Sequence, residues 1–326
     1  MVKYVLTGST GELGSRVFKH LLRLVPGKSK HLRSQHLTSL TPHTANDVIV
    51  SLYNPAGATA DITNSGVEVR KGDFAQPETL DAAYKGGDKL LIVSYPSINH
   101  EIRVKSHVAA IDAAKRAGIQ HIYYTSLAFA GDSSAAVMQA HIDTEAYLRN
   151  SGLTYTIIRE GIYSESFPLY FGYWSPSREG NEVLIPQGDG GIAWVCREDL
   201  GEGTAKLMVA DTHKNETILF SGSHALTLGG LAALISTILG RDPPLRVKEV
   251  SVDAYVANNQ GSEELLRKWA TTYPALARGE LAVVDPLLRE ILGRDLTPFE
   301  DTLREVLGVM GDGGAAAVKR YNKLRE

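Results

Sequence analysis

The sequence predicts an α/β fold in which a doubly wound parallel sheet is accompanied by a smaller C-terminal α+β lobe. Two features of the 326-residue chain carry this prediction. Short apolar runs alternate with helical patterns at nearly regular intervals as far as residue 161, as in a sheet covered by helices on both faces. A glycine-rich turn at residues 7–14 also follows the first apolar run, residues 4–6, at once.

The change of rhythm near residue 160 suggests a division into domains. We expect a dinucleotide-binding domain over residues 1–160 and a smaller substrate-binding lobe, interleaved with it, over residues 161–310. The tail, residues 311–326, is rich in Gly and Ala and then basic, so we expect it to be flexible. With 43% hydrophobic residues, the chain is large enough to bury one extensive core and a second, smaller one.

The glycines of the first turn have the spacing G-x-x-G-x-x-G, between a strand at residues 4–6 and a helix at residues 13–24. Gly8 lets the chain reverse, Gly11 leaves space for a pyrophosphate near the backbone, and Gly14 lets the helix pack closely on the strand. The helix N-terminus offers unpaired N–H groups to the phosphates. This pattern predicts a Rossmann-like dinucleotide site, the alternative being a tight turn without ligand.

The other expected elements continue the same alternation. Further strands are expected at residues 48–53, 67–71, 89–96, 122–126, 154–161, 216–223 and 245–251. Further helices are expected at residues 77–85, 100–117, 136–150, 227–240, 262–271, 285–293 and 298–309.

Composition excludes several classes of protein. The formal net charge of −3 and the sequence pI of about 6.4 give no sign of a nucleic-acid-binding protein. No apolar run reaches the length of a membrane span, and no apolar leader precedes the first strand. The single cysteine, Cys196, cannot form an internal disulfide and is expected to be a buried thiol. Together these features predict a cytoplasmic protein.

Residues 28–47 form an unusually long, polar and basic connection between the first helix and the second strand. Its histidines lack the spacing of metal ligands, and no metal site is expected anywhere in the chain. The segment is either a solvated loop or a lid that carries basic side chains toward a phosphate.

Several residues near the expected strand ends could contact a dinucleotide. Tyr53, at the end of the second strand, is neither acidic nor basic and does not decide between NAD and NADP. Asp73 could accept a hydrogen bond from adenine with Phe74 packed nearby, or it could cap the next helix. The Ser94–Pro96 segment ends a buried strand, where ligands of such sheets bind.

Aromatic residues crowd residues 163–174. They could form a wall for a flat aromatic or quinonoid ligand, or they could be core between the two lobes.

Six short motifs, in order along the chain, carry a resemblance to a known family. They are TGSTGELG at 7–14, NPAGA at 54–58, GDF at 72–74, YTSLAF at 124–129, HIDTE at 141–145 and REGIYSE at 159–165. In these motifs the chain resembles the NmrA-like branch of atypical short-chain dehydrogenases/reductases, whose members include NADPH-dependent quinone oxidoreductases and a triphenylmethane reductase. It departs from the family in the length of the 28–47 loop and in having Tyr53 where NADPH-using members have Arg.

The resemblance implies a dinucleotide across the first turn, with the ribose, adenine and nicotinamide over later strand ends. It favours NADP(H) over NAD(H). The implied binding residues are Gly8, Thr10, Gly11, Leu13, Gly14, Asn54, Asp73, Phe74, Ser94, Tyr95, Pro96, Gly161, Tyr163 and Glu165.

The usual proton donor of short-chain dehydrogenases is missing, because no Tyr of this chain has a Lys four residues later. His141 and Glu145 stand in its place on one face of a helix. They could form an oriented imidazole that donates a proton, or merely an ion pair on the helix surface. His141, Tyr163 and Ser126 are the candidate proton donors or oxyanion partners.

Without strong acid assistance, the acceptors best suited to hydride transfer are electron-poor conjugated compounds, since the charge left on them is delocalised. The sequence therefore predicts an NAD(P)H-dependent reductase of quinones or related aromatic compounds, with no nucleic-acid or membrane partner. The alternative is a dinucleotide-sensing regulator that acts through a protein partner without turnover.

Overall fold

A computed structural model describes residues 2–25, 46–259 and 261–308, which form two compact units. Unit 1 consists of Met1–Ser126, Ala140–Arg159 and Glu198–Ile218. Unit 2 consists of Leu127–Gln139, Glu160–Arg197 and Leu219–Glu326. Almost all of the predicted 28–47 loop and the whole 311–326 tail lie outside the described residues.

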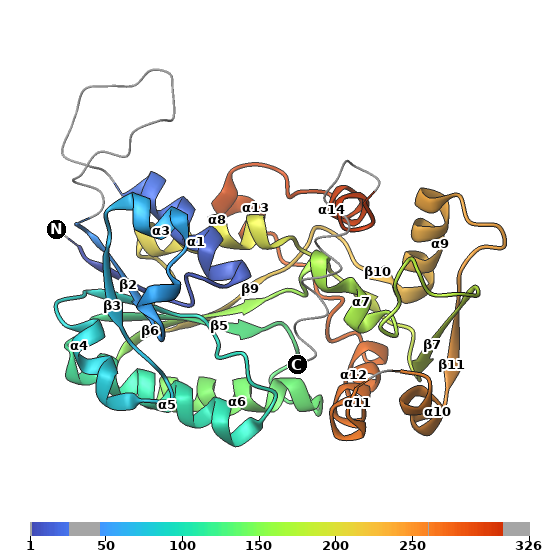
Figure 1. The fold of residues 1–326 in the computed structure, drawn as a ribbon, viewed down its shortest axis with the longest axis horizontal. Coiled ribbons are helices and arrows are strands. Elements are labelled where there is room, and N and C mark those ends of the chain that lie inside the picture. The colour runs from blue at the N-terminus through green and yellow to red at the C-terminus, as the bar shows by residue number, and fades with distance from the viewer. Residues whose placement is uncertain (1, 26–45, 260, 309–326) are drawn as a thin grey trace, which may run out of the picture. The chain divides into compact units, whose positions relative to one another are not determined.

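A seven-stranded sheet runs through the fold in the order β3-β2-β1-β4-β5-β6-β9 (Figure 1). Its strands are β1 (Tyr4–Thr7), β2 (Val48–Leu52), β3 (Glu68–Lys71), β4 (Lys89–Ile92), β5 (His121–Leu127), β6 (Thr154–Glu160) and β9 (Glu216–Phe220). The β1–β2, β2–β3, β1–β4 and β4–β5 pairs are parallel. The chain order reverses between β1 and β4, which confirms the predicted doubly wound sheet and places its switch point beside the glycine turn.

Helices cover both faces of the sheet in unit 1. Figure 1 shows α1, α3 and α8 on one side and α4, α5 and α6 on the other. Their bounds are α1 (Glu12–Leu24), α3 (Ala60–Ser65), α4 (Leu80–Tyr84), α5 (His100–Arg116), α6 (Ala136–Arg149) and α8 (Arg197–Ala210), with short 3-10 turns η1 (Pro55–Gly57) and η2 (Pro77–Thr79). The core between the sheet and α5 includes Val5, Leu90 and Ile111, all buried.

Unit 2 contains two small sheets and mostly short helices. Its strands are β7 (Glu182–Pro186), parallel to β11 (Arg246–Val250), and β8 (Gly191–Ile192), antiparallel to β10 (Leu226–Thr227). Its helical elements are η3 (Ser164–Ser166), α7 (Phe167–Tyr170), α9 (Leu228–Leu239), α10 (Val252–Ala257), α11 (Glu263–Ala270), α12 (Thr272–Ala277), α13 (Leu287–Leu292) and α14 (Phe299–Val306). Strands together with helices agree with the expected α+β composition of this part.

The chain passes between the units at residue 160, where the sequence predicts a domain boundary, and again near residues 126, 139, 197 and 218. The division into a 1–160 domain and a 161–310 lobe itself stays a prediction.

The structure corrects the predicted strand at residues 89–96, because β4 ends at Ile92. The next two N–H groups leave the strand pattern: Val93 donates to the Thr7 hydroxyl at 3.1 Å and Ser94 to the Thr125 hydroxyl at 3.0 Å. The predicted helix at 77–85 is also split, into the 3-10 turn η2 and the short α4.

The expectation of an aromatic wall is wrong for most of the 163–174 cluster. Phe167, Tyr170, Phe171 and Trp174 are all buried. Phe171 packs edge-to-face on Trp174, and Tyr170 packs on other rings of unit 2. Tyr170, for example, makes edge-to-face contacts with Trp194 and Trp269. These rings form core, and Tyr163 stands apart from them at the start of η3.

Helix α8 was not predicted, since its sequence lacks a clear apolar stripe. It packs so closely on α1 that a Cβ added at Gly201 would lie 2.5 Å from the Arg16 Cβ. The buried Lys89 ammonium donates to the Met208 carbonyl at the end of α8 at 2.7 Å, and lies 3.2 Å from the Asp211 carboxylate. These contacts join α8 to the sheet within unit 1.

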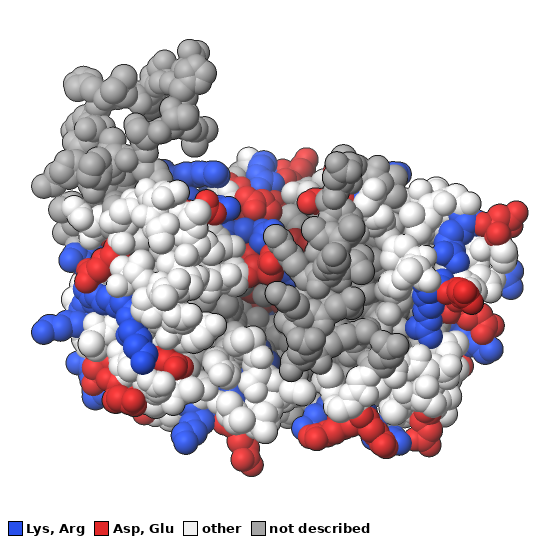
Figure 2. Space-filling view, in the orientation of Figure 1, with Lys and Arg blue, Asp and Glu red and all other residues white. Residues whose placement is uncertain are grey.

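Basic and acidic side chains are intermingled on the face that Figure 2 displays, in agreement with the small net charge. Among the described residues, no helix has the length and apolar content required to cross a lipid bilayer.

We predict that Lys89→Ala lowers the free energy of unfolding by about 3 kcal/mol, because it removes a buried cation and leaves the Met208 carbonyl without its donor. Lys214→Ala is the matched control: Lys214 pairs with the same Asp211 at 2.7 Å but is half exposed. Its removal is expected to cost less than about 1 kcal/mol. Urea denaturation of both variants measures the difference, and equal losses would contradict the burial argument.

Candidate functional site

The glycine turn joins β1 to α1 by very close backbone packing. Gly8 has a φ of +67°, and a Cβ there would lie 2.9 Å from the Val93 Cβ. The Gly11 N–H donates to the Gly8 carbonyl at 2.9 Å. A Cβ at Gly14 would come within 2.2 Å of that same carbonyl oxygen. Gly14 thus lets the helix approach the turn itself, rather than the strand as the sequence suggested.

The turn leaves polar groups suited to an anion. Gly11 is the N-cap of α1 and provides no side-chain hydrogen bond to the first turn of the helix. N–H groups at such a helix N-terminus are the ones that bind phosphate in dinucleotide-binding turns. The fully buried Ser9 hydroxyl has no hydrogen-bond partner among the described residues. The exposed Gly8, Thr10 and Gly11 border this cradle. It has the character of a diphosphate-binding turn.

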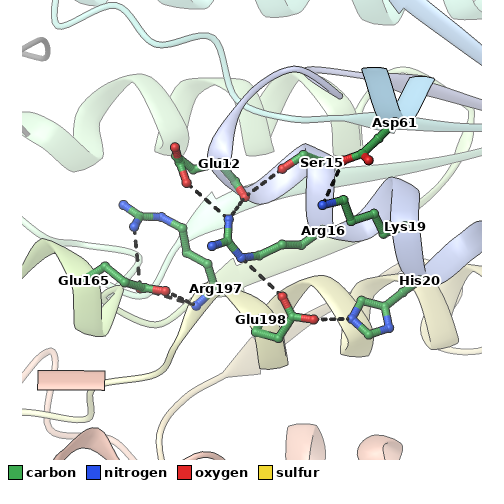
Figure 3. A network of polar contacts seen from close by, with 9 residues as sticks. All are labelled: Glu12, Ser15, Arg16, Lys19, His20, Asp61, Glu165, Arg197 and Glu198. Carbon is green, nitrogen blue, oxygen red and sulfur yellow. Dashed lines mark hydrogen bonds and ion pairs between the residues drawn. The ribbon is translucent and has the colours of Figure 1, made fainter. Parts of the chain in front are cut away.

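Charges around the first turns of α1 are balanced (Figure 3). The carboxylate of Glu12, next to Gly11, lies 3.2 Å from the Arg16 guanidinium, which also approaches Glu198 of α8 at 3.4 Å. Glu198 contacts the His20 ring at 2.8 Å, and Lys19 pairs with Asp61. Because Arg16 offsets Glu12, the helix N-terminus keeps its attraction for phosphate.

The ends of β2 and β3 hold the residues expected near adenosine. Tyr53 and Asn54 are exposed directly after β2. The Asp73 carboxylate accepts from the Ala75 N–H at 2.9 Å, while Gln76 is the N-cap of η2, so the capping alternative for Asp73 is wrong. The Phe74 ring centroid lies 6.1 Å from that of Tyr95.

The segment after β4 is held by a histidine that the sequence reading missed. The Tyr95 N–H donates to His107 Nε2 at 2.8 Å, and the Arg103 guanidinium donates to the Ser94 hydroxyl at 2.8 Å. Because Nε2 accepts, the neutral ring carries its proton on Nδ1, which lies 2.9 Å from the Thr144 hydroxyl. Burial, helped by the Arg103 charge, lowers the pKa of His107 to about 3.

His141 belongs to the same buried network. Its Nδ1 lies 2.9 Å from the Tyr124 hydroxyl, and the ring is only 3% exposed. Burial, with the nearby Arg103 charge, lowers the pKa of His141 well below its ordinary value, so the ring is neutral near pH 7. The expected surface ion pair with Glu145 is wrong, since both side chains are buried and Glu145 has other partners.

Ser126 is committed to Glu145. Its hydroxyl donates to the Glu145 carboxylate at 2.6 Å, and Arg149 and Arg159 each donate to the same carboxylate at 2.8 Å. Burial tends to raise the pKa of Glu145, but the hydrogen bonds from Arg159 and Ser126 outweigh it and lower the pKa. The hydroxyl hydrogen of Ser126 is therefore occupied by an ionised carboxylate.

Unit 2 holds the last group of predicted residues. A Cβ at Gly161 would lie 2.8 Å from the Phe220 carbonyl oxygen, so only glycine fits there. The Tyr163 hydroxyl donates to the Glu160 carboxyl at 2.6 Å, and the Arg197 guanidinium lies over the Tyr163 ring at 4.5 Å. The Glu165 carboxylate accepts from the Arg197 N–H at 3.0 Å (Figure 3).

Glu160 and His107 are the main residues that the sequence reading overlooked. The sequence position of each residue could have identified it. Glu160 ends the apolar strand β6 at the carboxyl edge of the sheet, and His107 lies on the buried stripe of α5, three residues after Val104 and four before Ile111. Cys196 is buried, as predicted.

Among the described residues, no cluster of three His, Cys, Asp or Glu side chains could hold a metal ion.

Comparison with known proteins connects this geometry to chemistry. Residues 34–168 match the sequence profile of a family described as NAD(P)H-binding. An NmrA-like family domain-containing oxidoreductase of Aspergillus flavus is 33% identical over 315 residues, which cover 94% of this chain and 95% of the relative.

Two solved structures are similar over nearly the whole chain. An NADPH-dependent quinone oxidoreductase of Escherichia coli, complexed with NADPH, has a TM-score of 0.79 at 27% identity, covering 93% of this chain and 99% of the other. A triphenylmethane reductase of Citrobacter sp., complexed with NADP(H), has a TM-score of 0.77 at 28% identity, covering 94% of this chain and 100% of the other.

We predict that Gly11→Val weakens NADPH binding at least tenfold while the protein still folds. The first atom of the new side chain has 3.2 Å to the Gly8 carbonyl, which is tight but tolerable, and the branched remainder projects toward the expected diphosphate. Ala210→Val, at the exposed end of α8, is the size-matched control and should bind normally. Calorimetric titration measures both affinities, and unchanged binding by Gly11→Val would contradict the site.

We further predict that the free energy of unfolding falls between pH 7 and pH 5, by about 2 kcal/mol for His107 alone. The unfolded chain takes up a proton on His107 below its ordinary pKa of 6.5, whereas the folded chain does so only near 3. Stability is therefore lost as the pH falls. Urea denaturation at both pH values should show a smaller loss for His107→Gln, but not for His100→Gln, a change at an exposed histidine.

Proposed function

Since the chain belongs to the NmrA-like family and is an NAD(P)H-dependent oxidoreductase, we propose that it reduces quinones or related electron-poor aromatic compounds by direct hydride transfer. The observation that carries the proposal is the similarity, over more than nine-tenths of the chain, to a quinone oxidoreductase and a triphenylmethane reductase.

The residues of the first turn fit a bound dinucleotide. The cradle at Gly11 and Gly14, the N-terminus of α1 without a side-chain cap and the Ser9 hydroxyl, which has no partner among the described residues, all suit a diphosphate. The bound coenzyme would supply a hydride. We propose that Gly8, Thr10 and Leu13 complete the diphosphate site, that Asn54 lies beside the ribose, and that Asp73 and Phe74 lie at the adenine. We assign Ser94–Pro96, Gly161 and Glu165 to the nicotinamide half.

We propose NADP(H) as the preferred coenzyme. Both solved relatives are complexed with it. In this chain, the residues that follow β2 include no carboxylate to repel a 2′-phosphate, since Tyr53 and Asn54 are uncharged. An exposed aromatic ring at Tyr53 is also free to pack against the adenosine.

The proposed acceptors follow from how little proton assistance the chain offers. A cationic triphenylmethane dye becomes neutral on accepting hydride and needs no proton. A quinone becomes a hydroquinone anion, a weak base whose charge is delocalised, and needs one proton. A simple ketone would leave a strongly basic alkoxide, and the chain has no Tyr-x-x-x-Lys pair to protonate it.

Of the three candidate proton donors we favour Tyr163. His141 is deeply buried and neutral, and the Ser126 hydrogen is held by the Glu145 carboxylate. The Tyr163 ring is partly exposed, and its hydroxyl is paired with a single carboxyl group.

We predict that the protein oxidises NADPH in the presence of menadione and of crystal violet, faster than it oxidises NADH, and that Gly11→Val reduces both rates at least tenfold. Loss of coenzyme absorbance is the measurement. The proposal fails if the wild-type protein binds NADPH but consumes none with any quinone or dye, an outcome that would favour a dinucleotide-sensing regulator.

A further inference from the structure

We infer that Glu160 is a positioning residue that keeps a proton at the Tyr163 hydroxyl, so that the Glu160–Tyr163 pair delivers a proton to acceptors left anionic by hydride transfer. This inference rests on the proposed function and extends it to a residue that the glycine turn and the comparisons do not identify.

The geometry of Glu160 is that of a protonated carboxyl group. The side chain is 1% exposed at the end of β6. One oxygen, Oε2, lies 2.6 Å from the Tyr163 hydroxyl, while the other, Oε1, is buried with no hydrogen-bond partner among the described residues. Burying an ionised carboxylate with an unpartnered oxygen costs much more free energy than burying the neutral carboxylic acid in the same position.

The surrounding charges do not reverse this preference. Arg197, over the Tyr163 ring, favours the ionised forms of both groups, and Glu165 opposes ionisation of Tyr163. Burial dominates and raises the pKa of Glu160 to about 8, in spite of Tyr163 and Arg197. The guanidinium is itself shared with the Glu165 carboxylate at 3.5 Å and the Ser166 hydroxyl at 2.8 Å. Glu160 thus holds a proton at neutral pH.

Glu145 is another buried carboxyl group of this protein, and it differs from Glu160 in its hydrogen-bond partners. It is as deeply buried as Glu160, yet both of its oxygens accept hydrogen bonds, from Ser126, Arg149 and Arg159. Two guanidinium groups keep Glu145 ionised, whereas the described residues give Glu160 one phenol and no direct cation. The fold therefore gives Glu145 and Glu160 opposite surroundings, and of these two Glu160 is the one able to give up a proton.

The proposed reaction conserves electrons and protons. A hydride carries two electrons from the reduced coenzyme to the quinone, which becomes a hydroquinone anion. The Tyr163 O–H bond breaks and its proton goes to the anion. The Glu160 carboxylic acid gives its proton to the Tyr163 oxygen, and solvent later returns one proton to Glu160. A cationic dye accepts hydride alone and bypasses all three proton transfers.

The test compares Glu160→Gln with the wild-type protein, using NADPH with menadione or crystal violet between pH 6 and pH 9. The wild-type kcat for menadione should fall as the pH rises through about 8. Glu160→Gln should lose this fall and reduce kcat for menadione about tenfold or more below pH 8. Its kcat for crystal violet should change less than about twofold, because that acceptor takes no proton.

Two further variants separate a relay from a structural effect. Tyr163→Phe should reduce menadione turnover at least as much, and the double variant no more than Tyr163→Phe alone, since Glu160 acts through Tyr163. Glu182→Gln, a change at an exposed carboxylate of β7 that pairs with Lys248, is the matched control and should leave both rates unchanged.

A readout independent of turnover is the infrared carbonyl band of the protonated carboxyl group. The wild-type protein should lose this band between pH 7 and pH 9, and Glu160→Gln should lack it. If Glu160→Gln does not fold, this titration of the wild-type protein and the Tyr163→Phe rates decide the question.

The inference is overturned if the Glu160 band is already absent at pH 6, or if Glu160→Gln slows both acceptors equally or neither. Those results leave the proposed function standing. A wild-type protein that oxidises NADPH with neither acceptor overturns both.

Discussion

The close approach of α1 to the Gly8 carbonyl is the constraint on which the rest of the structure depends. A Cβ at Gly14 would sit 2.2 Å from that oxygen, so only glycine allows the helix to start there. This approach fixes the first N–H groups of α1 above the end of β1. Because β1 lies between β2 and β4, the same contact places the glycine turn at the switch point of the sheet.

Within each unit, the neighbours of a buried titratable group set its charge. His107 and His141 are kept neutral near pH 7 by burial, helped by the Arg103 cation. His107 holds the segment after β4, and His141 contacts the Tyr124 hydroxyl. The Glu145 carboxyl is kept ionised by two arginines, whereas one Glu160 oxygen has no hydrogen-bond partner in the part of the chain that the structure describes. Such opposite treatment of similar groups is how one protein separates structural charges from a group that can release a proton.

The sheet and the glycine turn were predictable because their signals are local. A strand, three spaced glycines and a helix follow one another within the first 24 residues, and the later apolar runs are short and regular. Helix α8 was not predictable in this way, because it is held by tertiary contacts: Gly201 against Arg16, and Lys89 to the Met208 carbonyl. Its buried residues lie on several faces, so it shows no apolar stripe.

Contacts between residues distant in sequence also limited what could be predicted about the candidate site. Residue types could suggest His141, Ser126 and Tyr163, but not which hydrogen each would have available, since that depends on partners distant in sequence. Ser126 meets Glu145 from another element, and Tyr163 lies beneath Arg197. The aromatic cluster at residues 163–174 could have been either a wall of a ligand site or part of the core. The packing of its Tyr170 ring against Trp194 and Trp269 identifies it as core.

The central claim is that this chain moves a hydride directly from a coenzyme held at the glycine turn to an electron-poor acceptor. Its most direct test uses NADPH carrying deuterium at either face of C4, with mass spectrometry of the reduced triphenylmethane dye. We expect one deuterium on the dye's central carbon from one of the two labelled coenzymes and none from the other. Reduced dye that lacks deuterium from both, or no reduced dye at all, would contradict direct transfer.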